Sequence, residues 1–358
     1  MAAKRSIADW NGTQVAPGQS RDLKIEVGES YSGQTVSIPL HLRRGRRPGP
    51  VVFVTAALHG DEINGSGAIR ELIGDPTLQV AAGALILVPV LNVLAFERHA
   101  RYLPDRRDLN RCFPGAKAGS LASRYARAVF DEIVARSDFG IDLHTAAVRR
   151  TNYPTVRADL SQPPVRRLAR AFGGELILDS RGPKGSLRRA ASDAGCPTIV
   201  LEGGEVWKVE PSVVRCANLG IRRVLAALKM TRAASDKLST RLVVDHTRWV
   251  RAERGGFLWF HVGPGDVVDK GQPLATNTSL LGREKNVLTA PYGGIVIGMT
   301  TLPAVRPGEP VCHLGRIGRA ARAALDRKRG DPARDAEQQR LRADLAKSIL
   351  VVAPPDVD

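Results

Sequence analysis

The sequence has few aromatic residues and no long apolar segment. Phe, Trp and Tyr make up 5% of the 358 residues, whereas proteins that bind single-stranded nucleic acid depend on aromatic stacking platforms. The formal net charge is +17, but the arginines are scattered and form no basic tract. We therefore expect no specific nucleic-acid partner, and we attribute the charge to a generally Arg-rich composition. No apolar run approaches the ~18 residues needed to cross a bilayer, so no membrane partner is expected.

Cysteine is also scarce, and its spacing excludes two classes of site. The four cysteines lie far apart with no C-x-x-C pair, so the sequence predicts neither a disulfide framework nor a thiolate zinc site. The first residues, M-A-A-K-R-S-I-A-D-W, contain no apolar segment of the kind found in signal peptides. We expect a cytoplasmic protein in a reducing compartment. The sequence leaves open whether the chain forms a homo-oligomer.

The length suits one large domain followed by a smaller one. Strands that alternate with helices predict an α/β domain with a largely parallel sheet, and a later stretch with frequent Gly and Pro predicts a small barrel or sandwich. The predicted divisions are an α/β domain over 1–230 with a β-rich segment over 1–50, a polar linker over 231–241, a β-domain over 242–315, and a charged tail over 316–358 that is helical from about Asp335.

Apolar periodicity places the elements of the α/β domain. The predicted strands are 51–58, 84–90, 139–144, 175–178 and 197–201, and the predicted helices are 64–73, one that begins at Ser120, 164–172, 186–194 and 211–228. Between the second strand and the Ser120 helix, residues 97–115 show neither helical nor strand periodicity. Because a loop of this length is unusual inside a compact domain, we expect it to be functional.

The first of these strands leads into the most informative motif. Val51 to Leu58 is an apolar run that follows Pro-Gly-Pro, which is typical of a strand buried on both faces. It ends in H-G-D-E. His59 and Glu62 lie three positions apart on the turn that leaves the strand, where an imidazole nitrogen and a carboxylate oxygen can hold one zinc ion. The simpler alternative is a loop histidine beside solvated acids.

Two further predicted strands also end in residues that bind metals or move protons. His144 ends the strand over 139–144, and Glu202 ends the strand over 197–201. The carboxyl ends of strands in an α/β sheet form the ligand site. Two histidines and one glutamate with an open fourth position is the pattern of a catalytic zinc site. Glu202 would then be the general base that takes a proton from the zinc-bound water.

Asp142 lies two residues before His144, so both side chains point to the same face of the strand. Its carboxylate could accept the free ring N–H of a ligand histidine and fix the tautomer. An ordinary salt bridge explains the residue equally well, and the sequence leaves both interpretations open.

Four motifs, in this order and spacing, resemble the succinylglutamate desuccinylase/aspartoacylase family, which has the zinc carboxypeptidase fold. They are H-G-D-E-I-N-G over 59–65, D-L-N-R-C-F-P-G over 108–115, D-L-H-T over 142–145 and L-E-G-G over 201–204. The resemblance covers about residues 20 to 315. It implies one zinc ion per chain, bound by His59, Glu62 and His144, with Glu202 acting first as base and then as acid.

The resemblance also implies roles within the aperiodic loop. Asn110 and Arg111 match the pair that holds the substrate carboxylate in the family, and a guanidinium suits a carboxylate because it donates two parallel hydrogen bonds. Arg101 matches the arginine that polarises the scissile carbonyl, with Arg106 or Arg107 as alternatives. Residues 242–314 resemble the β-domain of the bacterial branch.

The chain departs from the family pattern in two places. After D-L-H-T it has A-A-V-R-R where relatives often have glycines, so we expect the acyl-side pocket to differ. The charged tail beyond residue 316 lies outside the resemblance.

Three functions remain open at this point. The leading hypothesis is a zinc-dependent amidohydrolase that deacylates an N-acyl amino acid or a related small amide bearing a carboxylate. The first alternative is a zinc carboxypeptidase that acts on small peptides, since the fold and metal site serve both reactions. The second is a non-catalytic binding or scaffold protein with a vestigial site, although the presence of every predicted metal ligand and of the base counts against it.

Overall fold

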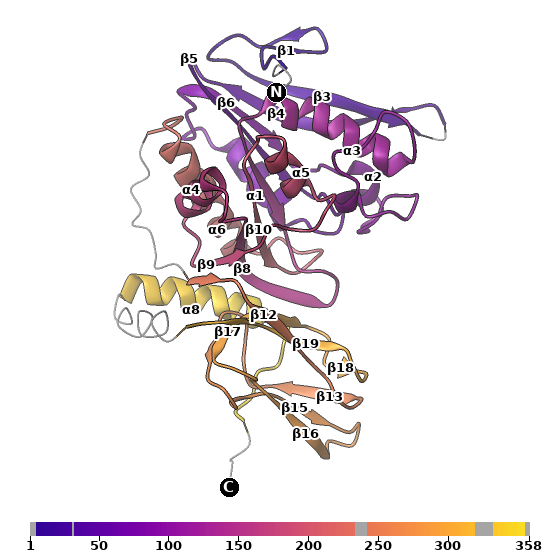
Figure 1. Cartoon of the computed structure of the whole chain (residues 1–358), viewed down its shortest axis with the longest axis vertical. Helices are drawn as coiled ribbons and strands as arrows, with labels where there is room; N and C mark the ends of the chain where they lie inside the picture. The colour runs from indigo at the N-terminus through magenta and orange to yellow at the C-terminus, as the bar shows by residue number, and fades with distance from the viewer. Residues whose placement is uncertain (1–4, 31, 233–241, 319–331, 355–358) are drawn as a thin grey trace.

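A thirteen-stranded mixed sheet is the central layer of the protein (Figure 1). The computed structural model describes residues 5–30, 32–232, 242–318 and 332–354. The strands of the large sheet are β3 (Ser20–Glu29), β4 (Thr35–Arg44), β5 (Arg47–Ala56), β6 (Ala82–Val88), β7 (Phe139–His144), β8 (Arg150–Ala158), β9 (Leu176–Asp179), β10 (Thr198–Gly204), β11 (Leu242–Val244), β12 (Thr247–Arg251), β14 (Val267–Val268), β17 (Gly294–Thr300) and β19 (Pro310–Arg316).

Four neighbouring strands at the centre of this sheet run parallel. β10 pairs with β7, β7 with β5, and β5 with β6, each in parallel register. These four strands correspond to apolar runs in the sequence. Strands that are buried on both faces of a sheet are expected to be almost continuously apolar. Because these strands are parallel, their carboxyl ends meet at one edge of the sheet. The three strand endings singled out from the sequence, at His59, His144 and Glu202, lie at this edge.

Helices cover both faces of the central strands. The helices are α1 (Asn64–Gly74), α2 (Val93–Phe96), α3 (Leu121–Glu132), α4 (Pro163–Phe172), α5 (Leu187–Asp193), α6 (Pro211–Ala227) and α8 (Pro332–Ala346), with short 3-10 turns η1 (Leu109–Arg111) and η2 (Val134–Arg136). Val52 and Val54 on β5 pack with the apolar faces of α1, α4 and α6. Phe53, between them, points to the opposite face and packs with α3 and α5. The two-residue alternation of β5 thus forms a core on each side of the sheet.

The structure confirms the predicted strands and helices of the α/β domain, with bounds that shift by a few residues. It adds one strand that the sequence did not predict. β8 pairs antiparallel with β10 and lies inside the sheet, although it contains Pro154. Proline is normally confined to edge strands because it lacks an N–H donor. The register between β8 and β10 shifts at Glu202 and Gly204, close to this proline.

Beyond residue 241 the chain continues the same sheet before it forms a second one. β17 pairs with β8, and β19 and β12 follow in turn. A separate four-stranded sheet contains β13 (Gly256–Phe260), β15 (Pro273–Thr278), β16 (Glu284–Thr289) and β18 (Ala304–Val305). A two-stranded sheet, β1 (Asp9–Trp10) with β2 (Thr13–Gln14), lies near the N-terminus. The mixed α/β sheet with a small antiparallel sheet after it agrees with the predicted fold class. The division into domains stays a prediction.

The predicted linker falls mainly on residues 233–241, which lie outside the described residues. The helix expected in the tail begins at Pro332, and its buried Leu345 packs with Tyr153 and Val213. Within the described ranges, no helix is both long enough and apolar enough to cross a membrane.

Candidate metal centre and active site

The turn after β5 places His59 at the carboxyl edge of the sheet. Asn92, which is fully buried, donates from its side-chain amide to the Leu58 carbonyl at 3.1 Å and caps α2 with its carbonyl oxygen. Glycine is required next to the histidine because a Cβ on Gly60 would lie 2.1 Å from the Ala95 carbonyl carbon. α2 therefore packs directly on the H-G-D-E turn and fixes its shape.

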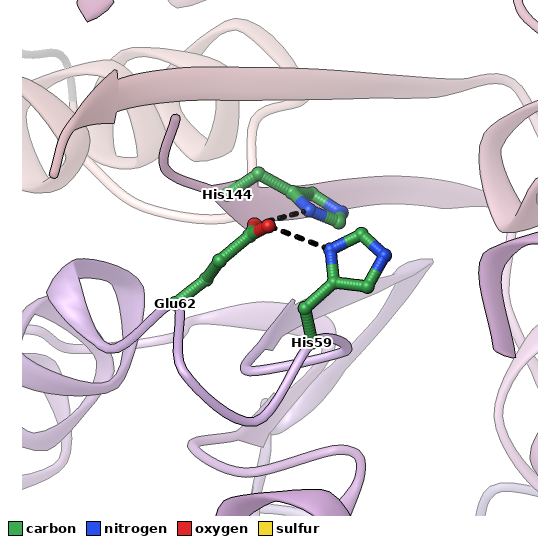
Figure 2. Close-up of side chains that lie close together, drawn as sticks. All are labelled: His59, Glu62 and His144. Atoms are coloured by element: carbon green, nitrogen blue, oxygen red, sulfur yellow. Dashed lines mark hydrogen bonds and ion pairs between the residues drawn. The ribbon is translucent and has the colours of Figure 1, made fainter. Parts of the chain in front are cut away.

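Glu62 brings the two histidines together (Figure 2). One carboxylate oxygen of Glu62 lies 2.7 Å from His59 Nδ1 and the other lies 2.8 Å from His144 Nδ1. The ligand atoms of the three residues all lie within 4.8 Å of one another, and all three residues are buried. The imidazoles meet edge to face with their centroids 5.1 Å apart. This compact N, N, O donor set has the chemistry of a zinc site.

Each histidine is held from behind by a second carboxylate. Asp142 Oδ2 lies 2.7 Å from His144 Nε2, and Thr55 donates to the other oxygen of Asp142 at 2.7 Å. Asp108 Oδ1 lies 3.1 Å from His59 Nε2. Metal-binding histidines are usually oriented in this way, because a carboxylate on the remote nitrogen leaves the facing nitrogen free for the ion. The donor set and its supports therefore fit a divalent metal.

The electrostatics of the centre follow from burial and from these pairs. Burial by itself would raise the pKa of the Glu62 carboxyl, but His59 and His144 outweigh it and hold the pKa well below its usual range. Burial would lower the pKa of both imidazoles. Instead, Glu62 and Asp108 raise the pKa of His59, and Asp142 and Glu62 raise the pKa of His144 well above 6.5. Metals bind the deprotonated forms of imidazole and carboxylate, so cation binding at this centre is expected to release protons.

Arg101 lies in contact with this centre. Its guanidinium donates to Glu62 Oε1 at 3.0 Å and to Asp108 Oδ2 at 3.1 Å. The alternatives, Arg106 and Arg107, are exposed to solvent. Of the three arginines named from the sequence, Arg101 is therefore the one positioned at the candidate metal ligands.

Glu202 lies on β10 next to the centre and about a fifth of its side chain is exposed. Its Cα is the register partner of the His144 Cα on β7. One oxygen, Oε2, accepts a hydrogen bond from Asn152 at 3.1 Å and forms an ion pair with Arg157 at 2.6 Å, and both of these residues come from β8. The structure thus places Glu202 beside the candidate metal ligand His144 but outside the group of residues that could hold a metal ion.

Asn110 and Arg111 lie where the aperiodic loop meets the start of α5. Asn110 Oδ1 accepts a hydrogen bond from the Leu187 amide at 2.9 Å, so its side-chain NH₂ group is directed away from that contact. Arg111 is exposed and donates to the Asn110 carbonyl at 2.7 Å. The two segments touch closely, since a Cβ on Gly185 would lie 2.3 Å from the Arg111 carbonyl oxygen.

Sequence reasoning did not identify three polar residues that contact the predicted site. Asp108 is the first residue of the D-L-N-R motif, and its position in that motif could have indicated a place in the site. Asn152 and Arg157 lie on β8, the strand that the sequence did not predict, and they carried no comparable signal.

Comparison with known proteins tests the assignment made from these residues. The family model described as "Succinylglutamate desuccinylase/Aspartoacylase catalytic domain" matches residues 48–228, which is half of the chain. The chain belongs to this family. It is therefore a deacylase-type hydrolase with a candidate metal site formed by His59, Glu62 and His144.

Individual relatives agree with the family assignment. N-alpha-acetyl-L-2,4-diaminobutyric acid deacetylase from Halomonas elongata is 28% identical over 265 residues, which cover 71% of this chain and 77% of that protein. The product-bound structure of the ectoine utilization protein EutE (DoeB) from Ruegeria pomeroyi superposes with a TM-score of 0.73 at 24% identity, covering 83% of this chain and 95% of that one. A succinylglutamate desuccinylase/aspartoacylase structure from Rhodobacter sphaeroides also gives 0.73 at 24% identity, with 88% and 99% coverage. At this identity the two structures establish the fold.

Proposed function

We propose that this protein is a zinc-dependent deacylase that hydrolyses the amide bond of an N-acyl amino acid. One observation carries the proposal. The Nδ1 atoms of His59 and His144 face the same carboxylate, while Asp108 and Asp142 hold the two Nε2 atoms. We infer one zinc ion per chain, bound by the two histidines and Glu62. When bound, zinc supplies a Lewis acid that activates water and polarises a carbonyl group.

Glu202 is the proposed general base. Asn152 and Arg157 hold Oε2, and no hydrogen bond from the described residues occupies Oε1, which is the oxygen available to accept a proton from water. After the amide bond breaks, the same carboxyl returns the proton to the leaving amine. Arg101 is proposed to stabilise the negative charge that develops on the carbonyl oxygen, because its guanidinium already lies at the Glu62 carboxylate.

The substrate's own carboxylate is proposed to bind at Asn110 and Arg111. The hydrogen bond from the Leu187 amide to Asn110 Oδ1 orients the Asn110 NH₂ group, which can donate to a carboxylate. The name of the Halomonas relative supports a substrate of the N-acyl amino acid class. Deacylation is favoured over carboxypeptidase action for the same reason.

A substrate panel tests this proposal. Zinc-loaded protein is incubated with N-acetyl-L-2,4-diaminobutyrate, N-acetyl-L-aspartate, N-succinyl-L-glutamate and a set of dipeptides, and the free amine released is quantified. Hydrolysis of at least one N-acyl amino acid, absent from Glu202→Gln protein that retains zinc, is the expected result. Hydrolysis of dipeptides alone would favour the carboxypeptidase alternative, and no hydrolysis by zinc-loaded protein would contradict the proposal.

A further inference from the structure

Trp207 lies in the loop between β10 and α6 and has an unusual backbone conformation. Its φ angle is +59°, in the left-handed region, and the residue is 54% exposed. A single exposed tryptophan needs no explanation, but a bulky residue at positive φ is an outlier. Such conformations persist where the surrounding contacts impose them, and they are concentrated at functional sites.

The loop that carries Trp207 is fixed at both of its ends by Asn64. The Asn64 side chain donates to Glu210 Oε2 at 2.7 Å and accepts a hydrogen bond from the Glu210 backbone N–H at 2.6 Å. The same NH₂ group donates to the Gly203 carbonyl at 3.3 Å. The Glu205 amide donates to Glu210 Oε2 at 2.9 Å. The loop is therefore anchored on the asparagine of the H-G-D-E-I-N motif, and Trp207 lies between its two anchored ends.

Trp207 has two N–H donors, and each reaches a different segment of the candidate site. Its backbone N–H donates to the Asp61 carbonyl at 2.9 Å, on the H-G-D-E turn. Its indole Nε1–H donates to the His99 carbonyl at 3.1 Å, two residues before Arg101. Trp207 therefore links the turn that carries two candidate metal ligands with the segment that carries Arg101.

The segment before Arg101 is a short irregular turn. His99 has a φ angle of +48°, which is again in the left-handed region. The backbone N–H groups of residues 97–100 donate to carbonyls of residues 93–96, so these bonds shape the turn without attaching it to the rest of the site. Among the described residues, the hydrogen bond that joins 97–100 to a distant part of the chain comes from Trp207. Packing of α2 on the H-G-D-E turn fixes the start of this segment, and Trp207 fixes its end.

The role proposed for Arg101 requires such a support. The side chain of Arg101 is 26% exposed, so burial alone does not hold its long, flexible stem. A donor stabilises a developing negative charge best when it is already in place as the charge forms. A shift of the His99 carbonyl would move the backbone of Arg101 with it, and a misplacement of about 1 Å can lower a rate roughly 100-fold.

We propose that Trp207 is a positioning residue for Arg101. Its indole N–H holds the His99 carbonyl and so keeps the guanidinium where negative charge develops on the scissile carbonyl oxygen. This inference rests on the proposed deacylase function and on the role proposed for Arg101. Loss of the N–H is expected to lower kcat and to leave KM and zinc content almost unchanged, because the contact that it supports is made in the transition state.

Two replacements remove the indole N–H and keep an aromatic ring. Trp207→Phe is the simpler variant. Replacement of Trp207 by 3-benzothienylalanine puts sulfur in place of the N–H at almost the same shape, so it guards against a folding defect. We expect kcat to fall roughly 10- to 100-fold in both. Trp259→Phe, which changes another exposed tryptophan on β13, is the matched control and is expected to behave as wild type.

A double-mutant cycle shows whether Trp207 acts through Arg101. Arg101→Ala removes the guanidinium by itself. If the indole serves to place that guanidinium, Trp207→Phe has little left to remove, so the double variant is expected to be almost as active as Arg101→Ala. A loss that came from general destabilisation, or from contact of the ring with the substrate, would instead add to the loss in Arg101→Ala.

Hydrogen–deuterium exchange gives a readout that does not depend on turnover. Peptides that cover residues 97–101 of the zinc-loaded protein are expected to exchange faster in Trp207→Phe than in wild type, because the segment opens more often without its attachment. The same peptides are expected to exchange at the wild-type rate in Trp259→Phe.

The outcomes separate this inference from the proposed function. If wild type hydrolyses N-acyl amino acids and both Trp207 variants keep a normal kcat, the deacylase function stands and the inference is wrong. Additive losses in the cycle would also overturn it. A raised KM with a normal kcat would show that the ring contacts the substrate, which likewise contradicts the positioning role. If no N-acyl amino acid is hydrolysed, the proposed function fails and exchange decides alone: faster exchange supports the inference, and unchanged exchange overturns it.

Discussion

Glu202 lies directly beside His144, because β10 and β7 pair in parallel register at these two residues. Side chains at paired positions point to the same face of a sheet. A predicted metal ligand and a predicted proton acceptor are thus fixed relative to each other by backbone hydrogen bonds. Substitutions at these two residues should therefore be separable: a change at His144 should reduce zinc content, whereas a change at Glu202 should reduce turnover while zinc content stays the same.

Metal content should depend on the three buried ligands and, less strongly, on the carboxylates behind them. We expect about one zinc per chain in wild type and none in His144→Ala. Asp108→Asn should weaken zinc binding roughly 10- to 100-fold, because the remote nitrogen of His59 loses its acceptor. Glu97→Gln, at an exposed position in the same loop, is the control. Elemental analysis and competition with a chelator provide the measurements, and full zinc retention in His144→Ala would show that the ligand set is wrong.

Glu202→Gln should keep zinc and lose turnover. The amide has nearly the same size as the carboxylate but cannot accept a proton, and general-base catalysis contributes roughly 10²- to 10⁴-fold. Steady-state kinetics and metal analysis are made on the same preparation. Loss of zinc would identify Glu202 as a ligand, and near-normal turnover would place the base elsewhere.

The carboxylate site is tested with a free acid and its methyl ester. Arg111→Ala should raise KM and lower kcat for the acid, because an anchor that also aligns the amide affects both constants. Arg111→Lys should restore activity only in part, since an ammonium offers a point charge where a guanidinium donates two hydrogen bonds. A penalty of equal size for acid and ester would contradict this role and would leave Arg111 as an exposed loop residue.

A strand from the C-terminal half should influence the base through Asn152. A Cβ on Gly298 would lie 2.2 Å from Asn152 Oδ1, the side chain whose NH₂ group donates to Glu202. We expect Gly298→Ala to lower kcat roughly 10- to 100-fold while zinc content stays unchanged. Gly293→Ala is the matched control, because its Cβ meets only the Val268 carbonyl oxygen, at 3.6 Å. If kcat of Gly298→Ala is normal and only its melting temperature falls, Asn152 does not position the base.

His313 should make the stability of the protein sensitive to acid. Burial, together with Arg157 and Arg150, lowers its folded-state pKa to about 4, below the ordinary value of 6.5, so the unfolded chain binds the extra proton between these values. The resulting stabilisation is complete above about pH 6.5 and is lost as the pH falls toward 4, and the part lost by pH 5 is on the order of 2 kcal/mol. His313→Phe keeps the stack on Trp249, whose ring lies 4.7 Å away, and should flatten the dependence. Urea unfolding at pH 7 and pH 5 measures the change in the free energy of unfolding between these pH values. An equal change in wild type and in His313→Phe would refute this assignment.

The candidate metal centre could be predicted from the sequence because its residues lie in short local motifs. His59, Glu62 and His144 each follow a run of residues that the sequence pattern predicts to be a buried strand, and parallel strands place their carboxyl ends at one edge of the sheet. The aperiodic loop was likewise expected to be functional, and it supplies Arg101 and Asp108 to the centre.

The residues around Glu202 could not be predicted from local sequence patterns. β8 contains Pro154 and has no alternating pattern, so local propensity argues against the strand that carries Asn152 and Arg157. The approach of Arg188 to Glu202 depends on how α5 packs across the sheet, and His313 reaches the same region from a strand more than 100 residues later. Contacts of this kind are set by tertiary packing and leave no periodic signal in the sequence.

The sheet continues from β8 into β17, so the end of the family match does not coincide with the end of a folded unit. The family match ends at residue 228, yet Thr151 and Asn152 pair with Met299 and Gly298. A chain cut at residue 228 would leave residues 150–152 of β8 unpaired on the side where β17 lies, although β9 would still pair with residues 155–158, and exposed strand edges recruit strands from other molecules. The segment that matches the family would then be prone to aggregation by itself, and the proposed general base, Glu202, would lose the strand that packs against Asn152.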